Sequence, residues 1–171
     1  MDAFFFHPKL VHVPLALGLL MPLIALGLLV AWWRAWLDPR GWLVAVALQG
    51  ILVASGVAAE RSGEREADRV EAFVPERFLE AHGDAAELFV LASFAVFVLM
   101  VIAFALAVVA RRGAQATATV ATLGTFVVLV LAFRTGAAGG RLVYEHGAAA
   151  AYVGPAAAGS RTFPEPGKRD D

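Results

Sequence analysis

Long apolar segments alternate with short polar segments along this chain. A helix that crosses a bilayer needs about 20 predominantly apolar residues, and four segments meet this requirement. Their approximate bounds are 10–33, 42–59, 85–110 and 117–146. The pattern predicts an all-α membrane protein, a bundle of four transmembrane helices within residues 1–154, followed by a disordered polar tail at 155–171.

A charged stretch, residues 60–79, separates the second apolar segment from the third. Its arginines recur at helical spacing, so we expect it to extend the second helix beyond the bilayer. The chain should then turn near Val74 and Pro75, because proline suits the first turn of a following helix. A solvated connector is a simpler interpretation of this stretch than a binding surface.

The short loops between apolar segments are basic. Arg34 and Arg40 follow the first segment, and Arg111 and Arg112 follow the third. Short loops rich in arginine and lysine remain in the cytoplasm. We therefore expect a multi-pass protein of the bacterial inner (cytoplasmic) membrane, with both termini and the middle loop on the outer, periplasmic side.

The composition agrees with a membrane protein and narrows the possible chemistry. Of the 171 residues, 60% are hydrophobic and 17% are charged, whereas soluble domains have about 25% charged residues. The net charge of −1 argues against nucleic-acid binding, which calls for a basic face. Since the chain has no cysteine, any bound metal or haem would be held by histidine, carboxylate or backbone groups.

All four histidines are predicted at the same end of the bundle. His7 and His12 open the first apolar segment. His82 precedes the third segment, and His146 ends the fourth. A hydrogen-bonded histidine at the membrane interface would explain any one of them. Imidazoles are costly to bury near a bilayer, however, so four at one level favour a metal or haem site.

Helical periodicity separates the roles of these histidines. A spacing of five residues puts His7 and His12 about 140° apart on an ideal helix, so the two do not form a chelating pair. One should face the bundle and the other the interface, and His12 is the deeper of the two. His82 shares a helix face with apolar residues and should point toward packed protein.

A b-type haem with two histidine ligands fits this setting better than zinc or copper, because a flat apolar ring fits between the helices of a bundle. His12 and His146, on the first and last helices, form the first candidate ligand pair. His82 and His7 form the second pair, which could hold a second haem or orient the first. A Zn or Cu site could use the same four histidines, together with a nearby carboxylate.

The end of the fourth segment has further features that suit a haem. Gly136 and Gly140 have the spacing that lets a helix or a flat cofactor approach the backbone. Arg134 and Arg141 are seven residues apart, share a helix face and could bind haem propionates. Carboxylates such as Glu87 are alternative partners for Arg134.

Two motifs resemble those of a known family. They are His7-Pro8-x-x-Val11-His12-x-Pro14 near the start and Gly139-Gly140-x-Leu142-Val143-Tyr144-x-His146-Gly147 near the end. The family consists of bacterial four-helix membrane proteins and is catalogued as a transmembrane domain of unknown function. The resemblance covers about residues 7–150, although Val13 stands where the family often has an aromatic residue. Some members are fused to Rieske-type iron–sulfur domains, which implies a redox setting near respiratory chains.

These observations predict a redox carrier or a subunit rather than a stand-alone enzyme, since the sequence has no nucleophile–base constellation and no phosphate-binding loop. The leading hypothesis is electron transfer through haem b near the outer face of the membrane. A quinone or a periplasmic redox protein would be the partner. The alternatives are a structural or assembly subunit of a larger membrane complex, and a Zn or Cu binding membrane protein.

Overall fold

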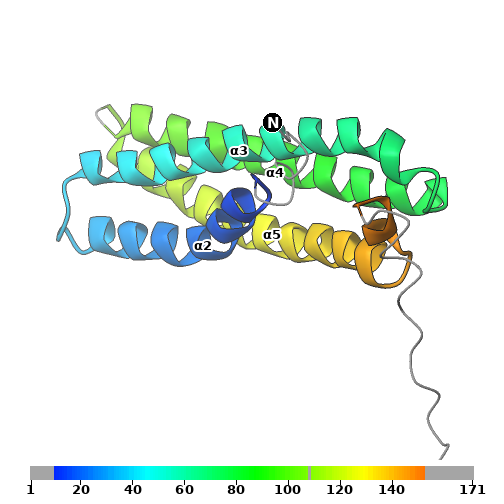
Figure 1. Cartoon of the computed structure of the whole chain (residues 1–171). Coiled ribbons are helices and arrows are strands. Elements are labelled where there is room, and N and C mark those ends of the chain that lie inside the picture. The colour runs from blue at the N-terminus through cyan, green and yellow to red at the C-terminus, as the bar shows by residue number, and fades with distance from the viewer. Residues whose placement is uncertain (1–9, 108, 153–171) are drawn as a thin grey trace, which may run out of the picture.

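The computed structural model describes residues 10–107 and 109–152, with the side chains of all but Arg69, Ala150 and Tyr152 (Figure 1). Four long helices make up nearly all of this part of the chain, and it contains no strand. The helices are α2 (His12–Trp33), α3 (Leu43–Val70), α4 (Glu76–Leu106) and α5 (Arg111–Tyr144). Short 3-10 helices, η2 (Pro39–Trp42) and η3 (Ala148–Tyr152), precede α3 and follow α5.

The four helices form an antiparallel bundle. Each packs against the helix before and after it in the chain, and α2 also packs against α5, which closes the ring. The contact between α4 and α5 is the most extensive. All four helices are long and apolar enough to cross a membrane. The predicted all-α bundle of four membrane-spanning helices is therefore confirmed.

The outer surface of the bundle is apolar as well as its core. Large hydrophobic side chains on all four helices are exposed, and Leu23, Leu91 and Leu123 each expose more than 60% of their surface. A water-soluble protein does not leave contiguous apolar patches of this extent exposed. These helix faces therefore contact the hydrocarbon of the lipid bilayer.

The main core cluster lies inside this apolar shell and depends on close approach of the helices. Gly18 of α2 lies so near α5 that an added Cβ would be 3.3 Å from the Cβ of Ala132. Gly124 of α5 is closer still to α4, since an added Cβ would be 2.7 Å from a methyl group of Val96. Small residues at these positions allow the helix–helix contacts that hold membrane bundles together.

Buried polar side chains in this core donate hydrogen bonds in two ways. The hydroxyl groups of Ser93 and Thr122 donate to carbonyl oxygens of their own helices, at Phe89 (2.7 Å) and Ala118 (2.8 Å). Gln49 is different, because its Nε2 donates to the carbonyl oxygen of Ser93 on α4 at 3.0 Å. Its longer side chain reaches the neighbouring helix.

The helices extend beyond the predicted membrane spans. The α3 helix continues through the charged stretch to Val70, and the chain turns before Pro75, which caps α4. The prediction for this connector is confirmed. The α4 helix already begins at Glu76, and α5 at Arg111, because hydropathy marks the part of a helix inside the membrane and not where the helix itself starts.

A second, smaller hydrophobic cluster closes the far end of the bundle. It contains Val70, Val74, Leu142 and Ala148, with Phe78, Leu79 and Ala151 packed against it. Between the two clusters lies a layer in which the described side chains are exposed or only half buried. In α5 this layer runs from Phe133 to Arg141, and in α4 from Glu80 to Leu88. The bundle is thus closed at two levels and less tightly packed between them.

Candidate histidine site in the loosely packed layer

His82 and His146 lie at one end of the bundle, and His12 does not reach that end. His82 lies near the start of α4, and His146 lies two residues after the end of α5. His12 starts α2, which is shorter than α5 and begins nearer the middle of the bundle (Figure 1). His7 lies outside the described residues. Of the four histidines predicted at one level, His82 and His146 are the two that the described structure brings to one face of α4.

His82 is half buried and lies against α5, as its helix face predicts. An added Cβ at Gly139 would be 3.1 Å from Cε1 of the His82 ring. A larger residue at position 139 would force the imidazole to move, so glycine is what admits the ring at this point. Thr135, one turn earlier on α5, donates from Oγ1 to the carbonyl oxygen of Ala85 at 2.9 Å and ties the two helices together.

His146 packs on the same helix as His82. Its ring stacks on Phe78 with centroids 3.7 Å apart and an interplanar angle of 16°. The Arg77 guanidinium also lies 4.6 Å from the Phe78 centroid. Phe78 and His82 are four residues apart and share a face of α4. The His82 and His146 imidazoles are therefore held at neighbouring turns of one helix face.

The turn after α5 positions His146. Its backbone N–H donates to the carbonyl oxygen of Arg141 at 3.1 Å, which extends the helical path past Tyr144. Gly147 then has a φ of 75°, a left-handed conformation that glycine adopts without strain. The α5 helix ends at Tyr144, and the His146 ring lies against α4.

His12 is exposed, so of the two histidines in the first segment it is not the one that faces the bundle. The buried stripe of α2 starts at Pro14 and continues through Gly18. His12 precedes Pro14 by two residues, about 200° around the helix, and so lies on the opposite face. His12 lies six residues before Gly18, which is about 9 Å along the axis of α2. Gly139 lies seven residues after Ala132, the residue that Gly18 contacts on α5. His12 and Gly139 are therefore at a comparable depth in the bundle.

The face of α5 that carries Gly136 and Gly140 is uncovered. These residues continue the stripe of Ala132, which packs on α2, but a Cβ added at either glycine would have no neighbour within 4 Å among the described residues. Arg134 and Arg141 on the same helix are exposed and make no ion pair within the described parts of the chain. The predicted small-residue surface is therefore present, and nothing in the described structure packs on it.

The match to a family model decides what kind of protein this is. The model covers residues 4–151, nearly the whole chain, and describes its members as predicted membrane proteins. This chain belongs to family DUF2231. The match confirms the resemblance to a four-helix membrane family of unknown function. No curated protein and no solved structure matches the chain.

Membership of this family assigns no ligand. The residues that could bind a metal ion or a haem must therefore be identified from their positions in the structure. Within residues 10–152 as described, no three histidine or carboxylate side chains come close enough to share one metal ion. A bis-histidine haem needs only two imidazoles and a flat surface. The described residues offer His12, His82 and His146 as donors and the Gly136–Gly140 face as the surface.

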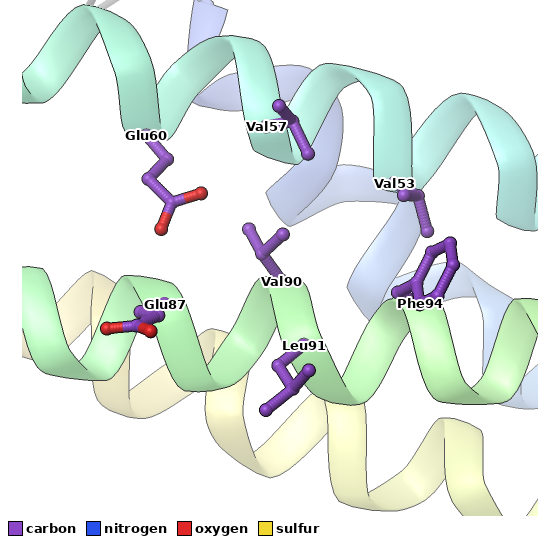
Figure 2. A pocket seen from close by; sticks show the side chains of 7 residues that line it. All are labelled: Val53, Val57, Glu60, Glu87, Val90, Leu91 and Phe94. Atoms are coloured by element: carbon purple, nitrogen blue, oxygen red, sulfur yellow. The ribbon is translucent and has the colours of Figure 1, made fainter.

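Two carboxylates on the opposite side of α4 were not among the site residues predicted from the sequence. Glu87 does not pair with Arg134. It lies beside a groove between α3 and α4, where Glu60 points toward it across the gap (Figure 2). Each is the carboxylate nearest to the long apolar run of its helix, so the sequence marks both as boundary residues but does not show that they face each other.

Proposed function

We propose that this protein transfers electrons in a bacterial inner membrane through a b-type haem held in the loosely packed layer. The observation that carries the proposal is the Gly136–Gly140 face of α5, on which no described residue packs, together with two imidazoles packed on one face of α4. A flat ring can lie on a glycine surface because no side chain keeps it from the backbone. The bound haem would supply one-electron redox chemistry.

Each candidate residue has a role that its environment supports. His12 is exposed at a depth comparable with Gly139, so its imidazole is available to a ligand outside the core. His146 would be the second ligand, oriented by its stack on Phe78. His82, seated on Gly139, would line the pocket or serve a second haem with His7. Arg134 and Arg141 have no ion-pair partners among the described residues and would bind propionates.

The same proposal includes an orientation. The loops that carry Arg34, Arg40, Arg111 and Arg112 lie at the end opposite the histidines. The positive-inside rule puts that end in the cytoplasm and the histidine layer near the periplasmic face. A quinone in the membrane or a periplasmic redox protein would then exchange electrons with the site.

The test is a reduced-minus-oxidised visible spectrum of the protein purified in mild detergent, with iron measured on the same sample. We expect sharp α and Soret bands and stoichiometric iron. His12→Gly and His146→Gly should each remove most of the haem absorbance, and added imidazole should restore it. Arg112→Ala, at the opposite end, serves as a control and should keep a full spectrum. Full spectra in both histidine variants would refute this ligand pair.

The uncovered glycine face favours a second candidate, a structural or assembly subunit of a larger membrane complex. Small residues four apart are a common surface for docking a neighbouring helix. A colourless protein that migrates with a large complex in native gels, and is released by Gly140→Leu, would favour this function. Stoichiometric zinc or copper without iron would instead favour the metal-binding alternative.

A further inference from the structure

A second open groove, of about 260 Å³, lies between η2 and the end of α4. It is at the end of the bundle where α2 joins α3 and α4 joins α5, opposite His82 and His146 (Figure 1). The residues that line it are Asp38, Pro39 and Arg40 on one side, and Phe104 and Ala107 on the other. The groove therefore holds an arginine and a carboxylate against an apolar wall.

Two hydrogen bonds fix the shape of this groove. Oδ1 of Asp38 accepts a hydrogen bond from the backbone N–H of Arg40 at 2.8 Å, which caps η2. The indole Nε1 of Trp42 donates to the carbonyl oxygen of Met100 at 3.1 Å and holds η2 against α4. Both Trp42 and Met100 are buried. An occupant would bind to walls that are already in place and would lose little free energy in ordering them.

The charges at this end of the bundle are mostly positive. Four arginines lie in or next to the two connections: Arg34, Arg40, Arg111 and Arg112. Asp38 is the one acidic residue in these connections. The N–H of Ala110 donates to the carbonyl oxygen of Leu106 at 2.8 Å, so the chain turns tightly from α4 to the arginines that begin α5. None of the four arginines makes an ion pair within the described parts of the chain, and together they attract an anion.

Tryptophan side chains indicate that the groove is at the level of the lipid headgroups. Trp33 and Trp36 expose 52% and 70% of their surface, and the Arg34 guanidinium lies 5.5 Å from the Trp36 ring centroid. Exposed tryptophans of membrane proteins concentrate where hydrocarbon meets water. From the groove to Glu60 on α3 and Glu87 on α4, neither helix has a charged residue. An anion that binds at this level and also covers the apolar helix faces beyond it is a membrane lipid.

We propose that this groove binds an anionic phospholipid of the phosphatidylglycerol class. The Arg40 guanidinium would donate hydrogen bonds to the phosphate, and Arg111 and Arg112 would add positive charge from the neighbouring connection. A hydroxyl of the glycerol headgroup would donate to Oδ2 of Asp38. The acyl chains would run inward along the apolar faces of α3 and α4. The proposal depends on neither the haem nor the orientation of the chain in the membrane.

Net charge and hydroxyl groups distinguish this lipid from zwitterionic ones. Phosphatidylcholine is neutral as a whole, and its trimethylammonium group has no N–H or O–H to donate. Phosphatidylethanolamine has an amine that could pair with Asp38, but it is also neutral as a whole. With four arginines against one aspartate, a lipid with a net negative charge should bind more tightly than either.

The experiment is native mass spectrometry of the delipidated full chain titrated with dioleoyl phosphatidylglycerol, phosphatidylethanolamine or phosphatidylcholine. We expect the first phosphatidylglycerol to bind on the order of tenfold more tightly than the first molecule of either other lipid. Arg40→Gln should weaken this binding by roughly tenfold, because it removes a charge-assisted hydrogen bond to the phosphate. Ala107→Trp, which fills the groove, should also weaken it while the chain keeps its helical circular-dichroism spectrum.

Arg34→Gln is the matched control, because it removes the same charge at the same end from a residue that does not line the groove. It should lower the affinity for phosphatidylglycerol by no more than about twofold. If it weakens binding as much as Arg40→Gln does, the attraction belongs to the basic end as a whole and the groove is not the site. Equal affinity for the three lipids, or a preference for the ethanolamine lipid that Asp38→Asn removes, would also overturn the proposal.

Discussion

The main core and the histidine layer are built from the same helices, but they use glycine in opposite ways. In the core, Gly124 lets α5 approach α4 until a methyl group of Val96 nearly touches its backbone. In the histidine layer, Gly136 and Gly140 face open space. A glycine in a helix interior costs about 0.5–1 kcal/mol relative to alanine. In the core this cost is offset by helix packing, whereas in the histidine layer no described contact offsets it.

The two regions also differ in how deeply their side chains are buried. Met21, Ala25, Leu52 and Met100 are fully buried in the main core. One or two helical turns beyond it, the side chains of α4 and α5 are half buried or exposed, and the helices close again only at the second cluster. Sites where the residue type lowers the stability of the fold are often functional. The layer between the clusters is therefore the place to look for a ligand.

The largest effect is expected from Gly124→Ala. The new Cβ would lie 2.7 Å from Cγ2 of Val96, and a β-branched side chain in a helix has essentially one rotamer, so Val96 cannot turn away. Overpacking of this kind costs about 1–3 kcal/mol, which exceeds the gain in helix propensity. Equilibrium unfolding in mixed micelles, followed by tryptophan fluorescence, should show a loss of free energy of unfolding of about 1–2 kcal/mol.

Gly27→Ala is the matched control for that variant, because an added Cβ there meets nothing within 4 Å among the described residues. It should not lower the free energy of unfolding. If Gly124→Ala is as stable as this control, the tight contact between α4 and α5 is not a source of stability.

Much of this contrast could be predicted from the sequence, and part of it could not. Hydropathy located the four spans, and the alternating direction of the helices predicted that His82 and His146 lie at one end, whereas His12 lies nearer the middle because α2 is short. The outward position of His12 could have been read from the stripe that begins at Pro14. The Glu60–Glu87 pair could not, because it depends on the axial register of α3 against α4. That register is set by packing at glycines such as Gly56, whose added Cβ would lie 3.3 Å from Val90.

A smaller effect of opposite sign is expected from Gly136→Ala. The new methyl group has no described neighbour within 4 Å, so only the helix propensity changes. The free energy of unfolding should rise by about 0.5–1 kcal/mol. The same variant should weaken the haem spectrum if a ring lies on this face. A stable protein with an unchanged spectrum would show that the cofactor, if any, binds elsewhere.

The smallest change in stability is expected from Gly139→Ala, which lies at the border between the two regions. The new Cβ would be 3.1 Å from Cε1 of His82, but this atom is at the far end of a half-buried side chain that can turn toward solvent. The strain and the gain in helix propensity, each about 0.5–1 kcal/mol, should nearly cancel. The displacement should appear in the imidazole NMR signals, where His82 shifts and His146 does not. A stability loss as large as that of Gly124→Ala would mean that His82 is held as rigidly as Val96. The layer would then be part of the packed core, and the contrast between the two regions would fail.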